Sequence, residues 1–221
     1  MMKEVTAADG HVLDCWIEPA QGERRSGLVI LQEIFGVTEQ LKGVARRYAK
    51  LGHEVAIPAL FDRVERGLVI PFDEGARGRE IMLSLGLEDT MRDIAAAVET
   101  LAEAGGKVGV MGFCWGGGLA IGAAGRLETG AAVSFYGTRL ERYLDRPLRA
   151  PLLCHFGTRD DHTPPEMIEA LRRHAPEAEI HLYEAGHAFA NDARPAAHVP
   201  EAAELAHRRT EAFLARHLQG E

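Results

Sequence analysis

One cysteine of the sequence stands between two closely spaced glycines. Gly112 and Gly116 flank Cys114 two positions away on each side, between an apolar stretch and a run of small residues. Glycines at these positions allow a strand to turn sharply into a helix, so that the central side chain projects from the strand end as a nucleophile elbow. A helix N-terminus favours a thiolate electrostatically. We therefore predict that Cys114 is a nucleophile; the alternative is a small buried residue at a glycine-rich turn.

Two further polar residues follow apolar stretches later in the chain. Asp160 comes after residues 151–156, and His187 comes after residues 179–183. The carboxyl ends of parallel strands are where an open sheet places its active-site groups, and a carboxylate there can orient an imidazole. Taken singly, Asp160 has the alternative of an N-cap or turn aspartate, and Asp161 could exchange roles with it; we prefer Asp160 because it is closer to the strand end. The alternative for His187, one of ten histidines, is a surface residue that caps the strand end. The chain order of nucleophile, acid and histidine matches the α/β-hydrolase triad, which predicts that the three act together.

Short apolar stretches alternate with amphipathic ones along the whole chain. This alternation predicts an α/β fold with a mostly parallel central sheet and helices on both faces, as a single domain over residues 1–221. Residues 58–87 are expected to form an irregular excursion with one short helix near 79–85, and the sequence alone leaves open whether they act as a lid. Strands are expected at 12–17 (in a hairpin with 4–6), 28–31, 55–57, 107–112, 131–136, 151–156 and 179–183, and helices at 38–51, 87–104, after the elbow to about 127, at 164–174 and at 201–217.

Composition and charge exclude several classes of protein. With 46% hydrophobic and 26% charged residues, the chain is typical of globular proteins and not of disordered ones. The 25 Lys and Arg against 33 Asp and Glu give a net charge of −8 without a basic run, which argues against nucleic acid and membrane partners. Three cysteines cannot build a framework of disulfides, and the N-terminus resembles no signal peptide. We expect a cytoplasmic monomer or weak homodimer that needs no cofactor and no metal.

Four segments of the chain match the pattern of a known family, and they span most of its length. On them the chain resembles the dienelactone hydrolase family of α/β hydrolases. The resemblance implies the α/β-hydrolase fold, with Cys114 as nucleophile, His187 as base and Asp160 as the group that orients it. The segments are Gln32 to Gly36, Gly112 to Gly117, Gly157 to Pro164 and Gly186-His187.

The resemblance also implies a role for Glu33, which follows the stretch 28–31 and so lies at a strand end. A carboxylate beside a thiolate disfavours the charged form, so Glu33 would keep Cys114 protonated until substrate arrives; the alternative is a solvated loop acid. We expect the backbone N–H groups of Ile34 and Trp115 to form the oxyanion hole. Cys114 would then attack an ester or lactone carbonyl, and water would hydrolyse the acyl-thioester.

Substrate recognition is where the sequence departs from the family pattern. Members that act on dienelactone bind its carboxylate with arginines, one of them four residues after the histidine, where this chain has Asn191. Arg77 and Arg79 are the candidates for a second arginine, and the alternative for both is an exposed helix face. Tyr136, at a strand end, is either a substrate contact or a core aromatic. These departures affect the recognition of a substrate carboxylate and leave the hydrolytic residues intact.

Several functions fit these residues. The leading prediction is cofactor-independent hydrolysis of a small ester or lactone, and within this class a thioesterase or a broad carboxylesterase stays open. A thiol redox protein that uses Cys114 is a different class of function. The sequence lacks a Cys-x-x-Cys motif, which argues against this class. A binding protein on a hydrolase scaffold is a third class of function. The predicted nucleophile, acid and base are all present, which argues against this class.

Overall fold

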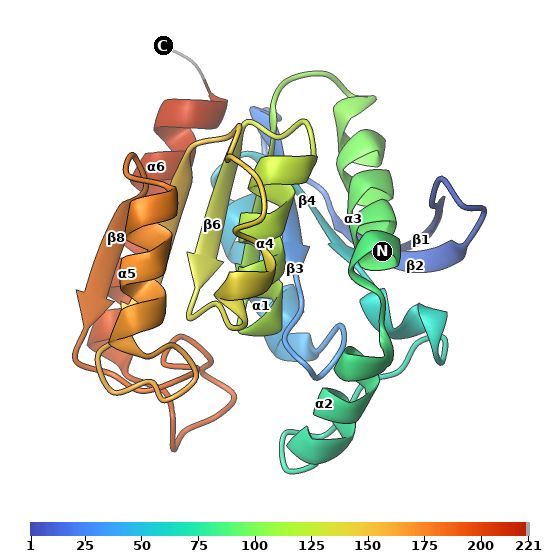
Figure 1. Ribbon diagram of the computed structural model, residues 1–221. Coiled ribbons are helices and arrows are strands. Elements are labelled where there is room, and N and C mark those ends of the chain that lie inside the picture. The colour runs from blue at the N-terminus through green and yellow to red at the C-terminus, as the bar shows by residue number, and fades with distance from the viewer. Residues whose placement is uncertain (220–221) are drawn as a thin grey trace. The chain divides into compact units, whose positions relative to one another are not determined.

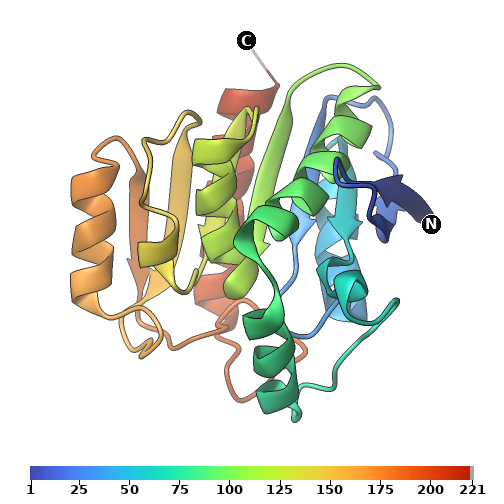
Figure 2. The same ribbon diagram turned by 45° about the vertical axis from the view of Figure 1, so that its right-hand side comes forward.

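A computed structural model describes residues 1–219 and shows two compact units, Met1–Gly109 and Val110–Glu221. In both units strands and helices alternate along the chain, as the sequence predicts (Figures 1 and 2). The assignment of the whole chain to a single domain stays a prediction. Within residues 1–219, no helix combines the length and the apolar character needed to cross a bilayer.

The first unit contains four strands in the order β1-β2-β4-β3. The predicted N-terminal hairpin is confirmed, because β1 and β2 pair antiparallel across the turn at Gly10. β2 and β4 are also antiparallel, whereas β3 and β4 are parallel. Every residue of β3 is buried, as its apolar run predicts. The bounds are β1 Met2–Thr6, β2 Val12–Glu18, β3 Ser26–Leu31 and β4 His53–Pro58.

Two long helices cover the strands of this unit. α1 (Glu39–Ala49) begins after Thr38, whose Oγ1 accepts a hydrogen bond from the N–H of Leu41 at 3.2 Å. Gly52, with φ +87°, follows the end of α1, where a left-handed residue stops a helix. α3 (Leu87–Ala102) packs on β3 and β4, while α1 packs on β2 and β4. Figure 1 shows these two helices on opposite faces of the strands.

The excursion between β4 and α3 is more ordered than the sequence predicts. It contains a 3-10 helix, η1 (Leu60–Arg63), which no sequence pattern predicts. Its α-helix, α2 (Gly75–Ser84), begins four residues before the predicted start near residue 79. The prediction is wrong there because Gly75 and Gly78 weaken helix propensity, whereas packing of the helix on its neighbours outweighs this preference.

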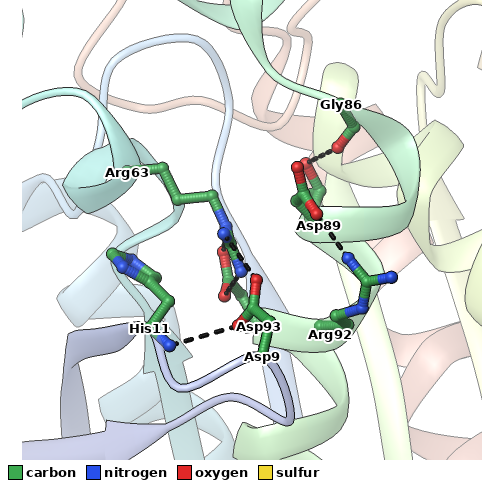
Figure 3. A network of polar contacts seen from close by, with 8 residues as sticks. Asp9, His11, Arg63, Gly86, Asp89, Arg92 and Asp93 are labelled. Atoms are coloured by element: carbon green, nitrogen blue, oxygen red, sulfur yellow. Dashed lines mark hydrogen bonds and ion pairs between the residues drawn. The ribbon is translucent and has the colours of Figure 1, made fainter.

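One arginine ties the excursion to two other segments. Arg63 of η1 forms a bidentate pair with Asp93 of α3, with both N···O distances at 2.7 Å, and its third nitrogen lies 2.9 Å from Asp9 in the β1–β2 turn (Figure 3). The N–H of His11 also donates to Asp9, at 3.2 Å. The hydrogen bond from Arg63 lowers the pKa of Asp9 to about 2. Arg63 therefore fixes η1 against both the hairpin and α3.

The second unit contains β5 from Val110 onward, followed in the sheet by β6, β7 and β8, and these last three strands run parallel. In Figure 2, α4 and α5 lie on one face of these strands and α6 lies on the other. This fulfils the expectation of a mostly parallel sheet with helices on both faces. The bounds are β5 Val108–Phe113, α4 Trp115–Arg126, β6 Ala131–Phe135, the 3-10 helix η2 Leu140–Arg142, β7 Leu152–Gly157, α5 Pro165–His174, β8 Glu179–Tyr183 and α6 Pro200–Leu218.

Candidate active site

Cys114 lies at the bend between β5 and α4 in a strained conformation with positive φ, at φ +55° and ψ −116°. Few residues other than glycine adopt positive φ, and such strain persists only where the surroundings hold it. Here the N–H of Cys114 donates to the carbonyl of Phe135 at 3.0 Å. The carbonyl of Cys114 accepts from the N–H groups of Gly117 at 3.0 Å and Thr138 at 3.1 Å. The strained backbone is therefore held from both sides.

Close backbone contacts explain why the positions around Cys114 are occupied by glycine. A Cβ atom on Gly112 would lie 1.9 Å from the carbonyl oxygen of Gly116, across the bend. A Cβ on Gly117 would lie 2.7 Å from the carbonyl oxygen of Phe135. Real side chains do not tolerate such distances, so the bend requires glycine at these positions. The geometry is that of the nucleophile elbow expected from the sequence.

Asp160 and His187 meet in the second unit. Asp160 follows β7 and His187 follows β8, and the Nδ1 atom of His187 lies 2.8 Å from Oδ2 of Asp160. The other carboxylate oxygen of Asp160 accepts the N–H of His162 at 2.8 Å. The side chain of Asp160 has no exposed surface. Because the carboxylate binds Nδ1, the Nε2 atom is the nitrogen that can exchange a proton or hydrogen-bond with a nucleophile.

His187 also forms a side-chain hydrogen bond with Cys114. Burial lowers the pKa of His187, but the hydrogen bonds with Asp160 and Cys114, together with the charges of these groups, outweigh burial and raise the pKa to about 10. The protonated imidazole is thus the favoured form at neutral pH. The imidazole of His187 thus has the carboxylate of Asp160 on one side and the side chain of Cys114 on the other. A catalytic role for the three residues stays a prediction.

Aromatic rings surround the imidazole of His187. The ring of Tyr136 lies 5.2 Å from it in an edge-to-face arrangement, and Phe189 lies 5.4 Å from Tyr136. Tyr136 is buried and has φ +37°. The ring of His162 lies 4.5 Å from His187. His162 is not among the residues predicted for the site, although its position two residues after Asp160 is a signal that could have indicated it.

Glu33 and Ile34 follow β3 in the first unit. The side chain of Glu33 is buried, with 7% relative exposure, which contradicts the alternative of a solvated loop acid. Ile34 is half-buried. Trp115 is the first residue of α4 in the second unit and is buried. The roles of Glu33 beside the thiol and of the Ile34 and Trp115 N–H groups stay predictions.

The candidate substrate-binding residues lie in different settings. Arg77 and Arg79 are on the exposed side of α2, where Arg77 forms an ion pair with Glu74 at 3.4 Å. Asn191 is buried, and its Oδ1 accepts the N–H of Ala193 at 3.1 Å, so its amide stabilises a turn. A role for these residues in binding substrate stays a prediction.

The three cysteines differ in exposure. Cys15 and Cys154 are buried, whereas Cys114 is partly exposed. Burial raises the pKa of Cys15 to about 12, and burial also raises the pKa of Cys154. Because the thiolate is the reactive form of cysteine, neither buried thiol is suited to act as a nucleophile at neutral pH.

Comparison with known proteins decides the family. Residues 15–218 match the dienelactone hydrolase family. The chain belongs to the dienelactone hydrolase family. A carboxymethylenebutenolidase from Pseudomonas putida is 30% identical over 96% of this chain and 94% of its own length. A second, from Pseudomonas sp. strain P51, is 33% identical over 90% of this chain and 87% of its own length.

Solved structures of the dienelactone hydrolase type share the fold of this chain. A putative dienelactone hydrolase from Klebsiella pneumoniae matches with a TM-score of 0.85 and 24% identity, over 98% of both chains. A dienelactone hydrolase-like promiscuous phosphotriesterase from metagenomic libraries matches with a TM-score of 0.77 and 19% identity, over 99% of this chain and 98% of its own. The fold is therefore that of the α/β hydrolases, and as a member of this family the protein is a hydrolase.

Proposed function

We propose that the protein hydrolyses small esters or lactones, with Cys114 as nucleophile, His187 as acid and base, and Asp160 as the group that orients His187. The observation that carries this proposal is the position of the His187 ring, which hydrogen-bonds to the carboxylate on one side and to the thiol on the other. A base that is itself oriented by a third group is the arrangement that activates a nucleophile.

The reaction proceeds in two halves. The sulfur of Cys114 attacks the carbonyl carbon, and the C=O π electrons move to the oxygen, which the N–H groups of Ile34 and Trp115 stabilise. When the oxyanion collapses, the C–O bond of the ester breaks and His187 gives its proton to the departing oxygen. An acyl-thioester remains on Cys114. His187 then removes a proton from water, and the resulting hydroxide attacks the thioester and releases the carboxylic acid and the thiolate.

In this proposal Glu33 controls the resting state of the nucleophile. Its buried carboxylate disfavours a negative charge nearby, so Cys114 rests as the thiol in this proposal. When substrate binds, the thiol proton passes to the Glu33 carboxylate, and the thiolate that forms attacks the substrate. The proton returns from Glu33 to the sulfur when the thiolate is released at the end of the second half-reaction. All the groups that the two half-reactions need are side chains and backbone of the chain itself. The reaction therefore requires no cofactor.

The relatives named carboxymethylenebutenolidase point to a lactone that carries a carboxylate as the first substrate class to test. Asn191 stands where family members that act on dienelactone have an arginine, and its amide is engaged in a turn. Arg77 and Arg79 are exposed on α2. We therefore expect activity on lactones and simple esters, with little advantage for a substrate carboxylate.

Turnover of p-nitrophenyl acetate tests the proposal, together with lactones with and without a carboxylate. We expect hydrolysis by the wild type and its loss in both Cys114→Ala and His187→Ala. Cys15→Ala is the matched control and should remain active, because its thiol is buried away from solvent. In the same series, Glu33→Gln should change the rate at which iodoacetamide alkylates Cys114.

Three outcomes would contradict parts of this proposal. Turnover that survives in Cys114→Ala would remove the cysteine from the mechanism. Activity that responds to dithiothreitol or peroxide and ignores His187→Ala would favour a thiol redox protein. An unchanged alkylation rate in Glu33→Gln would remove Glu33 from the control of the thiol.

A further inference from the structure

Gln32 is a fully buried residue that the proposed reaction does not use. Both ends of its amide are engaged within the first unit. Its Oε1 accepts the N–H of Leu60, the first residue of η1, at 3.0 Å. Its Nε2 donates to the carbonyl oxygen of Glu33 at 3.2 Å. A buried polar side chain with both ends bonded restrains the backbone that it contacts.

The bond to the Glu33 carbonyl also fixes the direction of a neighbouring donor. The C=O of Glu33 and the N–H of Ile34 belong to one peptide unit, which is planar and trans, so the two groups point in opposite directions. Whatever holds the carbonyl oxygen therefore also holds the N–H. Gln32 acts in this way on the N–H of Ile34, although it makes no contact with that atom.

The next peptide is held from the side of α2. A Cβ atom on Gly78 would lie 1.9 Å from the carbonyl oxygen of Ile34, so the helix backbone touches this peptide directly. One residue further on, the carbonyl of Phe35 accepts the N–H of Ile70 at 2.9 Å. Gly36 has φ +82°, and a Cβ there would lie 2.3 Å from the carbonyl oxygen of Leu68. The excursion thus braces the Gln32–Gly36 segment along its length.

We propose that Gln32 and Gly78 are positioning residues that preset the direction of the Ile34 N–H as an oxyanion donor. This inference rests on the proposed function, in which that N–H stabilises the tetrahedral intermediate. A donor that already points to the developing charge needs no reorganisation during the reaction, and this is the source of its catalytic value. Residues 58–87 then serve as a brace for the oxyanion loop.

Gln32→Met is the direct test, because methionine keeps the length of the side chain and removes its hydrogen bonds. We expect kcat for p-nitrophenyl acetate to fall about tenfold or more, with a much smaller change in KM. Binding of a trifluoromethyl ketone, whose adduct with a thiolate carries an oxyanion, should weaken in parallel. Alkylation of Cys114 by iodoacetamide forms no oxyanion, so its rate should stay within about twofold of the wild type.

A matched pair of glycine variants in α2 tests the same inference from the other side. Gly78→Ala places a methyl group against the Ile34 carbonyl and should lower kcat as Gln32→Met does. Gly75→Ala, in the same helix, brings its Cβ only to 3.9 Å from Phe35, which is an ordinary contact, and should keep the wild-type kcat. If Gln32→Met does not fold, as judged by circular dichroism, the glycine pair carries the test.

The outcomes separate this inference from the function on which it rests. A folded Gln32→Met or Gly78→Ala variant whose kcat stays within about twofold of wild type would overturn the positioning role. An equal fall in turnover and in alkylation would also overturn it, because it would show a general loss of structure. A wild type without Cys114-dependent turnover would instead overturn the proposed function.

Discussion

His187 depends on two neighbours for its protonation state. The carboxylate of Asp160 and the thiol of Cys114 both hydrogen-bond to its ring, and together they outweigh a burial that by itself lowers the pKa. The ring therefore holds its proton across neutral pH and loses it only near pH 10. In the proposed reaction this proton supports the nucleophile, because an imidazolium stabilises a negative sulfur beside it.

Asp160→Asn should lower the pKa of His187, since it removes one of the negative charges that raise it. We expect the ring to titrate well below pH 10, as followed by the NMR signals of its C–H protons. The value of kcat/KM should fall by about tenfold or more, because the ring loses its orientation as well as its charge partner.

The neighbouring aspartate provides the control for this prediction. Asp161 is exposed, and Asp161→Asn should leave both the titration of His187 and turnover unchanged. The two residues are adjacent and chemically identical, and the sequence favours Asp160 only because it is closer to the strand end. A larger effect in Asp161→Asn than in Asp160→Asn would contradict this prediction and would show that Asp161, not Asp160, orients His187.

Residue types and their order along the chain predict which side chains lie next to His187, whereas the catalytic roles of these residues stay predictions. Cys114, Asp160 and His187 each follow an apolar strand, and parallel strands bring their carboxyl ends to one edge. The environment of Gln32 is different, because its partner Leu60 is 28 residues away. No local pattern encodes that contact, so its role emerges only from the fold.

The elbow between β5 and α4 depends on Gly112. Gly112→Ala would place a methyl group 1.9 Å from the carbonyl oxygen of Gly116, and either the strand or the helix must move. We expect the free energy of unfolding to fall by about 2 kcal/mol or more and turnover to be lost. Urea denaturation and the p-nitrophenyl acetate assay measure the two effects.

Gly43→Ala is the control for this variant. Gly43 lies on the exposed side of α1, and the nearest atom to an added Cβ is 4.0 Å away. Alanine favours a helix over glycine, so stability should rise by up to about 1 kcal/mol while activity stays unchanged. Equal stability of the two variants would show that the close approach at Gly112 carries no cost.

The elements that the sequence predicts well are those with strong periodicity. β8 has the predicted bounds, and α3 and α6 agree within two residues of theirs. The excursion after β4 is predicted poorly, because its glycines and charged residues carry no clear period. Gly78 illustrates the reason: it weakens a helix locally, yet only glycine allows α2 to touch the carbonyl of Ile34.

At the scale of the whole molecule, each unit buries a histidine in its neutral form. His53 in the first unit lies with its Nδ1 2.7 Å from the hydroxyl of Ser26, and burial lowers its pKa to about 4. His155 in the second unit lies between the hydroxyls of Tyr183 at 2.8 Å and Thr210 at 2.9 Å, and burial lowers its pKa as well. Both units are therefore sensitive to acid.

His53 predicts how stability changes with pH. Above pH 6.5 the ring is neutral in the folded and unfolded states alike. Between pH 6.5 and about 4 only the unfolded state binds a proton, so the free energy of unfolding should fall by about 3 kcal/mol over this range from His53 alone. His53→Asn should remove this part of the pH dependence, as measured by urea denaturation at a series of pH values.

His198→Asn is the comparison for that series. His198 is half-buried and precedes α6, so this variant controls for the replacement of a histidine at another place in the chain. A His53→Asn variant whose stability still declines with acid as steeply as the wild type would mean that other groups account for the decline.

The guanidinium of Arg63 forms ion pairs with the carboxylates of Asp9 and Asp93, which differ in their exposure to solvent. Asp93 is almost wholly covered, whereas Asp9 keeps a solvent-facing surface. Dissolved ions screen an exposed charge far more than a covered one. Rising ionic strength should therefore weaken the ion pair between Arg63 and Asp9 first, which loosens the tip of the N-terminal hairpin. The ion pair between Arg63 and Asp93 of α3 should persist to higher salt concentration.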